Sequence, residues 1–199
     1  MRILLQIAAT FTTLLAIIWS TNAMAEESPR AIVEKATTGI ISELNRYSID
    51  ERTDELVKSL VLEHLVPAVD QQRVAMGALG KHWRRANPEQ REAFIVRFRD
   101  QQIRTYSGAF RAFDGEGFTI GDERISDNGD RAFVRGQLIP KSGQPIPIDF
   151  RLYQNGDGQW RVYDAVVAGL GMVKSYRDQL SQRLENMTIA QLLEELESE

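Results

Sequence analysis

Apolar residues recur at the three- and four-residue spacing of amphipathic helices through the first half of the chain, from residue 28 to residue 113. A first helix is expected from Pro29 to about residue 47, because Ser28 can act as its N-cap and proline suits the first helical position. A second helix is expected over 51–64, before Pro67, and one or two short helices over 70–86.

The strongest helix-start signal is NPEQ at 87–90, where Asn87 can cap the helix and Gln90 can reach back to it as in a capping box. This signal predicts a long helix that ends near Phe113. Aromatic residues at helical spacing either fill a core or line an apolar cavity, and the spacing is compatible with both. The apolar stripe consists of Phe94, Phe98, Tyr106, Phe110 and Phe113, and the opposite face carries Arg97, Arg99, Arg104 and Arg111.

The second half of the chain changes to the two-residue period of strands. Four strands are expected over 118–126, 131–140, 145–154 and 159–168, and the short turns between them predict an antiparallel meander. Alternation in the third strand predicts one covered face and one wet face. The expected covered side chains are Ile146, Ile148, Phe150 and Leu152, and the wet ones are Pro147, Asp149, Arg151 and Tyr153.

The fourth strand leads into the apolar run VVAGLGMV at 166–173, which contains no acid, base or nucleophile. A helix is expected from Gly171 to about Asn186, and TIAQ at 188–191 starts a short acidic tail helix. The predicted fold class is therefore α+β: N-terminal helices, a curved four-stranded antiparallel sheet covered by helices, and C-terminal helices. Such a covered, curved sheet is expected to leave a concave apolar cavity between the layers.

The N-terminal segment does not fit this pattern. Residues 3–19 are almost entirely apolar and precede a small-x-small triplet that ends at Ala25, which predicts a signal peptide over 1–25 with cleavage after Ala25. The alternative is a retained membrane anchor, for which the run is short. Residues 26–199 are expected to form one domain, with a small helical lobe at about 48–86.

Composition excludes several classes of function. The net charge of −4, with both signs interleaved, makes nucleic acid an improbable partner, and there is no polybasic patch for an anionic membrane. The absence of cysteine excludes disulfides, thiol catalysis and cysteine–zinc sites. With a cleaved signal peptide, these features predict a freely moving periplasmic or secreted protein.

Signals for catalysis are sparse. His64 and His82 lack metal-type spacing to a partner, and the cations Lys81, Arg84 and Arg85 are expected to depress the pKa of His82. Asp164, in the apolar fourth strand, is the one candidate for acid–base chemistry, of the kind that isomerases and dehydratases perform in cone-shaped α+β folds. Its structural alternative is to pair with an arginine or to cap a backbone group. No catalytic or metal-binding residue is therefore assigned.

Three blocks of sequence carry a family resemblance: LVPAVD at 65–70, LGKHWRRANPEQREAFIVRFRDQQIRTYSGAF at 79–110 and VYDAVVAGLGMVKSYRDQL at 162–180. In order and spacing they resemble the MlaC-type periplasmic phospholipid-binding proteins, also called the toluene-tolerance Ttg2 family. The family often has an acidic residue before the junction glycine and a serine two after it. Ala168 and Gly171 stand at these positions, so neither position supplies a polar side chain.

The resemblance implies a soluble carrier with a cone-shaped, NTF2-like fold that holds a phospholipid as cargo and needs no other cofactor. It also implies shuttling between an inner-membrane ABC transporter complex with an MCE-domain subunit and an outer-membrane lipoprotein complex, to maintain lipid asymmetry of the outer membrane. We expect a monomer. The expected lipid-binding residues are Phe94, Phe98, Tyr106, Phe110, Ile148, Phe150, Val166, Leu170, Met172, Val173 and Tyr176, with both tyrosines at the mouth.

Two other hypotheses stay open at this point. One is a small-molecule isomerase or dehydratase that uses Asp164. The other is a general periplasmic interaction or chaperone module, which would have a filled core. Lys81, Arg84 and Arg85, with the basic face of the long helix, are either a docking surface for the membrane partners or a solvated face.

Overall fold

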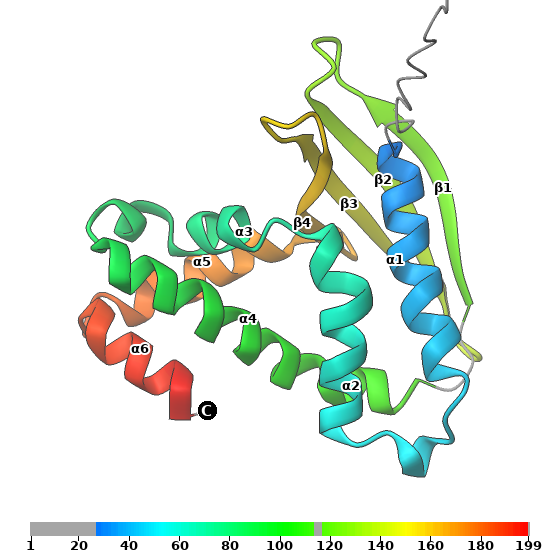
Figure 1. Cartoon of the computed structure of the whole chain (residues 1–199), viewed down its shortest axis with the longest axis horizontal. Coiled ribbons are helices and arrows are strands. Elements are labelled where there is room, and N and C mark those ends of the chain that lie inside the picture. The colour runs from blue at the N-terminus through cyan, green and yellow to red at the C-terminus, as the bar shows by residue number, and fades with distance from the viewer. Residues whose placement is uncertain (1–26, 114–116, 199) are drawn as a thin grey trace, which may run out of the picture.

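The computed structural model describes residues 27–113 and 117–198, so the predicted signal peptide lies outside the described residues. It confirms the α+β class (Figure 1). No helix in the described ranges is both long and apolar enough to cross a membrane. The helices are α1 (Pro29–Leu44), α2 (Asp54–Leu60), α3 (Gln71–Leu79), α4 (Pro88–Arg111), α5 (Met172–Arg183) and α6 (Ile189–Ser198).

The helix starts follow the capping signals of the sequence. Ser28 accepts a hydrogen bond from the backbone N–H of Ala31 at the start of α1, and Asn87 and Gln90 form the reciprocal capping box of α4. The helix predicted over 51–64 is interrupted: after α2 the chain continues as a π-helical turn, Val61–Leu65, and a 3₁₀ turn, Val66–Ala68. These turns bring the chain to the start of α3.

The region predicted as one or two short helices contains α3 and a 3₁₀ turn, Gly80–Arg84. Gly80 separates them because its φ of 57° is a left-handed conformation that glycine adopts readily. An added side chain there would also press against the aliphatic part of Arg177 in α5.

The sheet has five strands in the order β1-β2-β3-β4-β5, so the prediction of four was wrong in number. All neighbouring pairs are antiparallel, which confirms the predicted meander. The four expected strands are present, and the fifth is a two-residue strand within the apolar junction. The strands are β1 (Gly117–Ile125), β2 (Arg131–Ile139), β3 (Ile146–Gln154), β4 (Trp160–Val167) and β5 (Leu170–Gly171).

The junction is a tight hairpin before it becomes a helix. Val167 pairs with Leu170, and the two residues between them, Ala168 and Gly169, have φ values of 48° and 84°. Positive φ at both central positions is what a type I′ turn requires, and this turn matches the twist of the flanking strands. The hairpin therefore accounts for the fifth strand, and α5 begins at Met172 directly after it.

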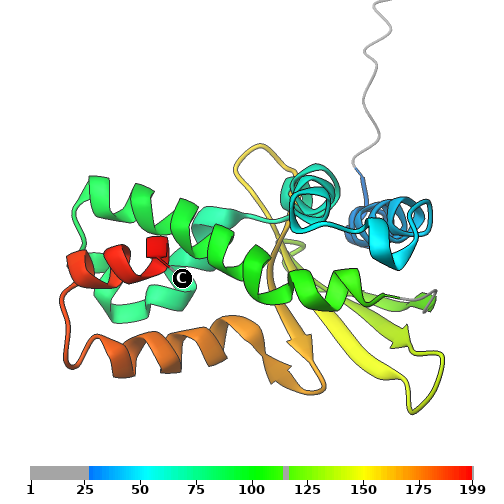
Figure 2. The ribbon, with the colours of Figure 1, turned by 90° about the horizontal axis from the view of Figure 1, so that it is seen from below.

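Three apolar clusters hold these elements together. One lies among α3, α4, α5 and α6, and the largest of its fully buried side chains are Phe94 and Phe98. A second lies where α1 packs on the sheet, through Ile32 and Val33, and a third joins α1, α2 and the C-terminal half of α4. The segment 48–86 contributes to the first and third clusters. Figure 2 shows the helical part and the sheet side by side, with α4 extending across both.

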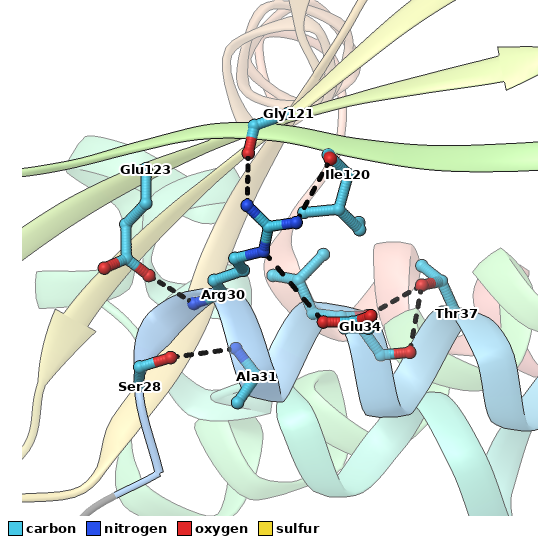
Figure 3. Close-up of polar contacts among 9 residues, drawn as sticks. Ser28, Arg30, Ala31, Glu34, Thr37, Ile120, Gly121 and Glu123 are labelled. Carbon is cyan, nitrogen blue, oxygen red and sulfur yellow. Dashed lines mark hydrogen bonds and ion pairs between the residues drawn. The ribbon is translucent and has the colours of Figure 1, made fainter.

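Polar contacts fix the N-terminus of α1 against β1 (Figure 3). The backbone N–H of Arg30 donates to the carboxylate of Glu123 at 2.6 Å, and its guanidinium donates to the carbonyl of Gly121 at 3.2 Å. This contact lies where the β1–β2 register shifts between Ile120 and Glu123. A carboxylate near a helix N-terminus is favourable, and the guanidinium satisfies a carbonyl of the irregular strand.

Candidate functional site

The strand register divides the sheet into two faces. We call the face that packs on α1 the inner face, because it carries the buried side chains of Val134, Leu152 and Val162. Residues that are opposite each other on neighbouring strands share a face, and successive residues alternate. The pairs Leu152–Val162, Phe150–Ala165 and Ile148–Val167 are therefore all on the inner face.

Part of the inner face is apolar but only half-buried, and Ile146, which was expected to be covered, is 37% exposed. Phe118 and Leu138 are paired with each other, and the phenyl rings of Phe118 and Phe150 meet edge-on with centroids 6.1 Å apart. Gly136 makes room for Phe118, since an added Cβ would lie 2.5 Å from that ring. We call this set the inner-face patch: Phe118, Leu138, Ile146, Ile148, Phe150, Ala165 and Val167.

Of the residues expected to bind lipid, Ile148 and Phe150 lie in this patch. Val166 does not, because it pairs with Asp149 on the opposite face. The register shift between Arg151 and Leu152 accounts for the difference, since an extra residue in β4 reverses which side chains point inward. Val167 takes the inward position that a regular alternation would give to Val166.

The aromatic stripe of α4 is divided among different surroundings. Phe94 and Phe98 are 0% and 2% exposed, stack with ring centroids 5.1 Å apart, and belong to the core of the helical part. Phe110 is half-buried beside the cluster formed with α1 and α2. The structure therefore places Phe94 and Phe98 in a filled core, and it does not bring them together with the inner-face patch.

Tyr106 and Tyr176 join α4 to α5. Their hydroxyl oxygens are 2.7 Å apart, and the ring of Tyr176 packs edge-on against Phe98 with centroids 5.0 Å apart. Burial, above all, raises the pKa of the Tyr176 hydroxyl, and the hydrogen bond with Tyr106 raises it further. Tyr106 remains exposed. The pair thus joins an exposed tyrosine to a half-buried one, and its predicted position at a mouth stays a prediction.

The remaining candidates lie at the junction. Leu170 is 68% exposed, whereas Met172 and Val173 are half-buried at the start of α5. Val173 packs against Gly77 of α3, where an added Cβ would lie 2.7 Å from its side chain. Of these three residues, Leu170 is thus the one free to contact an external molecule in this conformation.

Asp164 adopts both of the structural roles that were its alternative to catalysis. One carboxylate oxygen pairs with the guanidinium of Arg151 at 3.0 Å, and the other accepts the backbone N–H of Val173 at 3.0 Å. Gly171, the N-cap of α5, has no side chain to accept that N–H. Asp164 therefore caps α5 from the neighbouring strand.

Both histidines lie partly or fully buried in the described part of the chain. Burial lowers the pKa of His82, and the charges of Lys81 and Arg85 lower it further, in the direction predicted from the sequence. The Nε2 atoms of His64 and His82 are buried and have no hydrogen-bond partner in the structure. Within the described ranges, no group of three or more potential metal ligands is found.

The basic face of α4 binds other parts of the protein. Arg97 and Arg104 donate to the carbonyls of Leu193 and Leu196 in α6, both at 2.9 Å. Arg99 pairs with Asp100, and Arg111 pairs with Asp54. Arg97 and Arg104 therefore contact α6 and Arg111 contacts α2, whereas Arg99 pairs within α4.

Two open depressions are present on the surface. One lies between α2 and the end of α4 and is lined by polar residues that include Asp50, Arg52 and Arg111. The other is lined by residues of α6 and the preceding loop, among them Glu194 and Glu195. Neither contains a residue of the expected lipid site, so the apolar cavity and the cone shape stay predictions.

Comparison with known proteins agrees with the resemblance seen in the sequence. Toluene tolerance protein ttg2D of Pseudomonas putida is 25% identical over 164 residues, covering 81% of this chain and 75% of that protein. The intermembrane phospholipid transport system binding protein MlaC of Haemophilus influenzae is 27% identical over 178 residues, covering 86% of this chain and 83% of that protein.

A solved structure is similar over most of its length. It is the phospholipid-binding protein from Ralstonia solanacearum in complex with a phospholipid, with a TM-score of 0.75 and 26% identity, and the match covers 87% of this chain and 96% of that one. The MlaC protein family matches residues 34–198. Because this match spans most of the sequence, the chain belongs to the MlaC protein family.

Proposed function

We propose that the protein is a phospholipid-binding transport protein whose cargo contacts the inner-face patch. The observation that carries the proposal is an apolar surface on the covered side of a sheet that the helices leave half-buried. A filled core would bury these side chains, as it buries Phe94 and Leu152. The solved relative from Ralstonia solanacearum, which holds a phospholipid, supports this assignment.

Physical chemistry explains why such a carrier needs apolar surface more than reactive groups. A diacyl phospholipid has roughly 30 methylenes, each worth ~0.8 kcal/mol when removed from water, so unassisted transit through water would cost ~24 kcal/mol. The carrier must cover most of that surface and still release the lipid to a membrane. Apolar contacts from Ile148 and Phe150 are non-directional, so they suit chains of varied length.

We propose a carrier and not an enzyme. The arrangement of Asp164 supports this, because both of its carboxylate oxygens already bind groups of the protein itself. A general base must have a free oxygen within reach of the substrate proton. Among the described residues, Nε2 of His64 and of His82 has no hydrogen-bond partner, and burial lowers the pKa of His82. In this proposal no cofactor is required, and the bound phospholipid is cargo.

We further propose that the protein works in the periplasm, after removal of residues 1–25, as a monomer. It would move phospholipid between an inner-membrane complex with ABC-transporter and MCE-domain subunits and an outer-membrane lipoprotein complex, and so maintain outer-membrane lipid asymmetry. The name of the Haemophilus influenzae relative, which belongs to an intermembrane phospholipid transport system, supports this pathway.

The test is the lipid content of purified protein. We expect native mass spectrometry and solvent extraction to show co-purifying phospholipid. Ile148→Glu should lower the occupancy at least tenfold, because the buried carboxylate would replace an acyl contact. The matched control is Val96→Glu on the exposed side of α4, where Val96 is 44% exposed.

The two variants separate a site from a general effect of an added charge. Protein without lipid that also fails to take phospholipid from vesicles would refute the carrier function. Equal lipid occupancy in Ile148→Glu and Val96→Glu would refute the inner-face patch as the binding surface, while leaving the carrier function intact.

A further inference from the structure

The outer face of the sheet, opposite the inner face, is rich in arginine. In one row across the strands Arg124 lies opposite Phe133, which lies opposite Arg151. In the next row Arg131 lies opposite Tyr153, which lies opposite Arg161. Alternation along β2 places a further arginine on this face. The full set is Arg124, Arg131, Arg135, Arg151 and Arg161.

This face has the opposite charge to the protein as a whole. The chain has a net charge of −4, whereas this face carries five arginines against Asp149 and Asp164, with the exposed Asp122 in the irregular part of β1. Asp164 is already neutralised by Arg151. The side chains of Arg124, Arg131 and Arg135 are exposed, and none of them has an ion-pair partner among the described residues.

On β1 and β2 the same face is open to solvent, and Arg124, Arg131 and Arg135 are exposed there. Helix α1 lies on the inner side, whereas the starts of α3 and α5 meet the outer face at β3 and β4, where Tyr153 contacts Asp70 and Asp164 caps α5. Aromatic rings lie among the guanidinium groups of this face. The Arg73 guanidinium stacks 3.7 Å above the centre of the Tyr153 ring, and the rings of Tyr153 and Tyr163 meet edge-on with centroids 6.1 Å apart.

The residue types distinguish a protein partner from a membrane. Arginine and aromatic residues are enriched at protein–protein interfaces and lysine is depleted, and the five cations of this face are all arginine. A guanidinium binds carboxylates through two parallel hydrogen bonds. By register, the exposed large apolar side chains of the sheet belong to the inner face; they are Ile125, Ile146 and Leu170. Among the described residues, the outer face therefore exposes no large apolar side chain that could insert into a bilayer.

We propose that the outer face of the sheet is a docking surface for an acidic patch on a partner protein. Arg124, Arg131 and Arg135 supply the free guanidinium groups, and Phe133 lies between two of the arginine side chains. The proposal goes beyond cargo binding, because cargo contacts the inner face. It therefore assigns separate faces of one sheet to the lipid and to a protein partner.

The first experiment measures binding of the mature protein to fluorescent poly-L-glutamate at low salt. The triple variant Arg124→Glu, Arg131→Glu, Arg135→Glu should bind at least about tenfold more weakly. Each exposed guanidinium–carboxylate contact changes the dissociation constant by less than about tenfold, and the three contacts act together. The matched control is Lys81→Glu, Arg84→Glu, Arg85→Glu, which makes the same charge change on exposed residues of the 3₁₀ turn and its C-cap. A set with glutamine in place of glutamate covers the case in which charge reversal prevents folding.

Loss of binding in the outer-face variants with retention in the control supports the proposal. Equal loss in both variants, or loss in the control alone, overturns it, because binding would then follow net charge or the other cluster. Two further measurements test other occupants. The first is binding to vesicles of phosphatidylethanolamine and phosphatidylglycerol, and the second is self-association measured by sedimentation. The proposal is overturned if the protein binds these vesicles more strongly than poly-L-glutamate and the outer-face triple variant loses that binding. It is also overturned if the protein self-associates and the triple variant does not.

A cross-linking experiment tests the surface in cells. A photo-reactive amino acid at Gln137, an exposed outer-face residue of β2, should form an adduct with another protein that disappears in the outer-face triple variant and persists in the control. A lipid adduct, a dimer of this chain or the absence of any adduct would contradict the proposal. Phospholipid content is measured in every variant and should be unchanged, so failure of docking is distinguishable from failure of cargo binding.

Discussion

Asp164 offers the sharpest test of how the junction is built. The side chain of Asp164 is 5% exposed, and its two oxygens bind the Arg151 guanidinium and the Val173 N–H, each at 3.0 Å. Asp164→Asn keeps the shape and one acceptor oxygen but removes the charge. Asp164→Ala removes both bonds and leaves the first turn of α5 without a side-chain cap.

The expected magnitudes follow from these bonds. Loss of a cap costs typically ~1 kcal/mol, and a hydrogen bond to a charged group contributes ~1.5–3 kcal/mol. Arg151 is 46% exposed, so water screens that pair and the lower end applies. We expect the free energy of unfolding to fall by about 1 kcal/mol in Asp164→Asn and about 2–3 kcal/mol in Asp164→Ala.

Urea unfolding followed by circular dichroism gives these values, and lipid occupancy is measured on the same samples. The control is Arg151→Gln, which removes the pair and leaves the cap, and should cost about as much as Asp164→Asn. Equal stability of Asp164→Ala and the unmodified protein would refute the capping role. Full loss of lipid in Asp164→Asn with unchanged stability would show that the carboxylate contacts the cargo.

Three further changes test other parts of the fold. Ala168→Asn should raise the free energy of unfolding, measured in urea, by about 0.5–1 kcal/mol. Alanine is strained at the positive φ of this position, whereas asparagine tolerates it and forms the favoured Asn-Gly turn with Gly169. Unchanged stability would argue against strain. Burial lowers the pKa of His82 below that of an unfolded histidine, which is near 6.5, so the unfolded chain binds the proton first. The free energy of unfolding should therefore fall as the pH drops below about 6.5. His82→Gln should flatten this pH dependence, and equal slopes in the two proteins would contradict the argument. The double variant Arg97→Gln, Arg104→Gln should loosen α6, because both guanidinium contacts to its backbone carbonyls are lost. We expect faster hydrogen exchange over 189–198 and a free energy of unfolding lower by roughly 1–3 kcal/mol. Unchanged exchange would show that apolar packing alone holds the helix.

Local signals in the sequence predict the elements well. Ser28 and Asn87 cap the helices that they were expected to start, and the two-residue period identifies the four long strands. These features depend on residues close together in the chain. The two-residue β5 was missed because a type I′ turn with alanine at its first central position lacks the usual Asn-Gly signature.

The site is harder to predict because it depends on register and on which helix meets which surface. The irregularity beside Tyr163 has no sequence signature, yet it turns Val167 inward in place of Val166. Periodicity shows that Phe94 is on an apolar stripe, but only the packing of α6 against α4 decides that this stripe is filled. Strand alternation in β1 and β2 was the available signal for Phe118 and Leu138, which sequence reasoning missed.

The apolar junction connects the two halves of the proposed function. The junction contains no reactive group, and its role in the structure is to direct the chain. A tight hairpin ends the sheet, and Asp164 on the outer face then fixes the first turn of α5. From that point α5 carries Tyr176 to its contact with Tyr106 on α4. A shift of Asp164 is therefore expected to move the tyrosine pair as well as the junction, which gives this buried carboxylate a structural role.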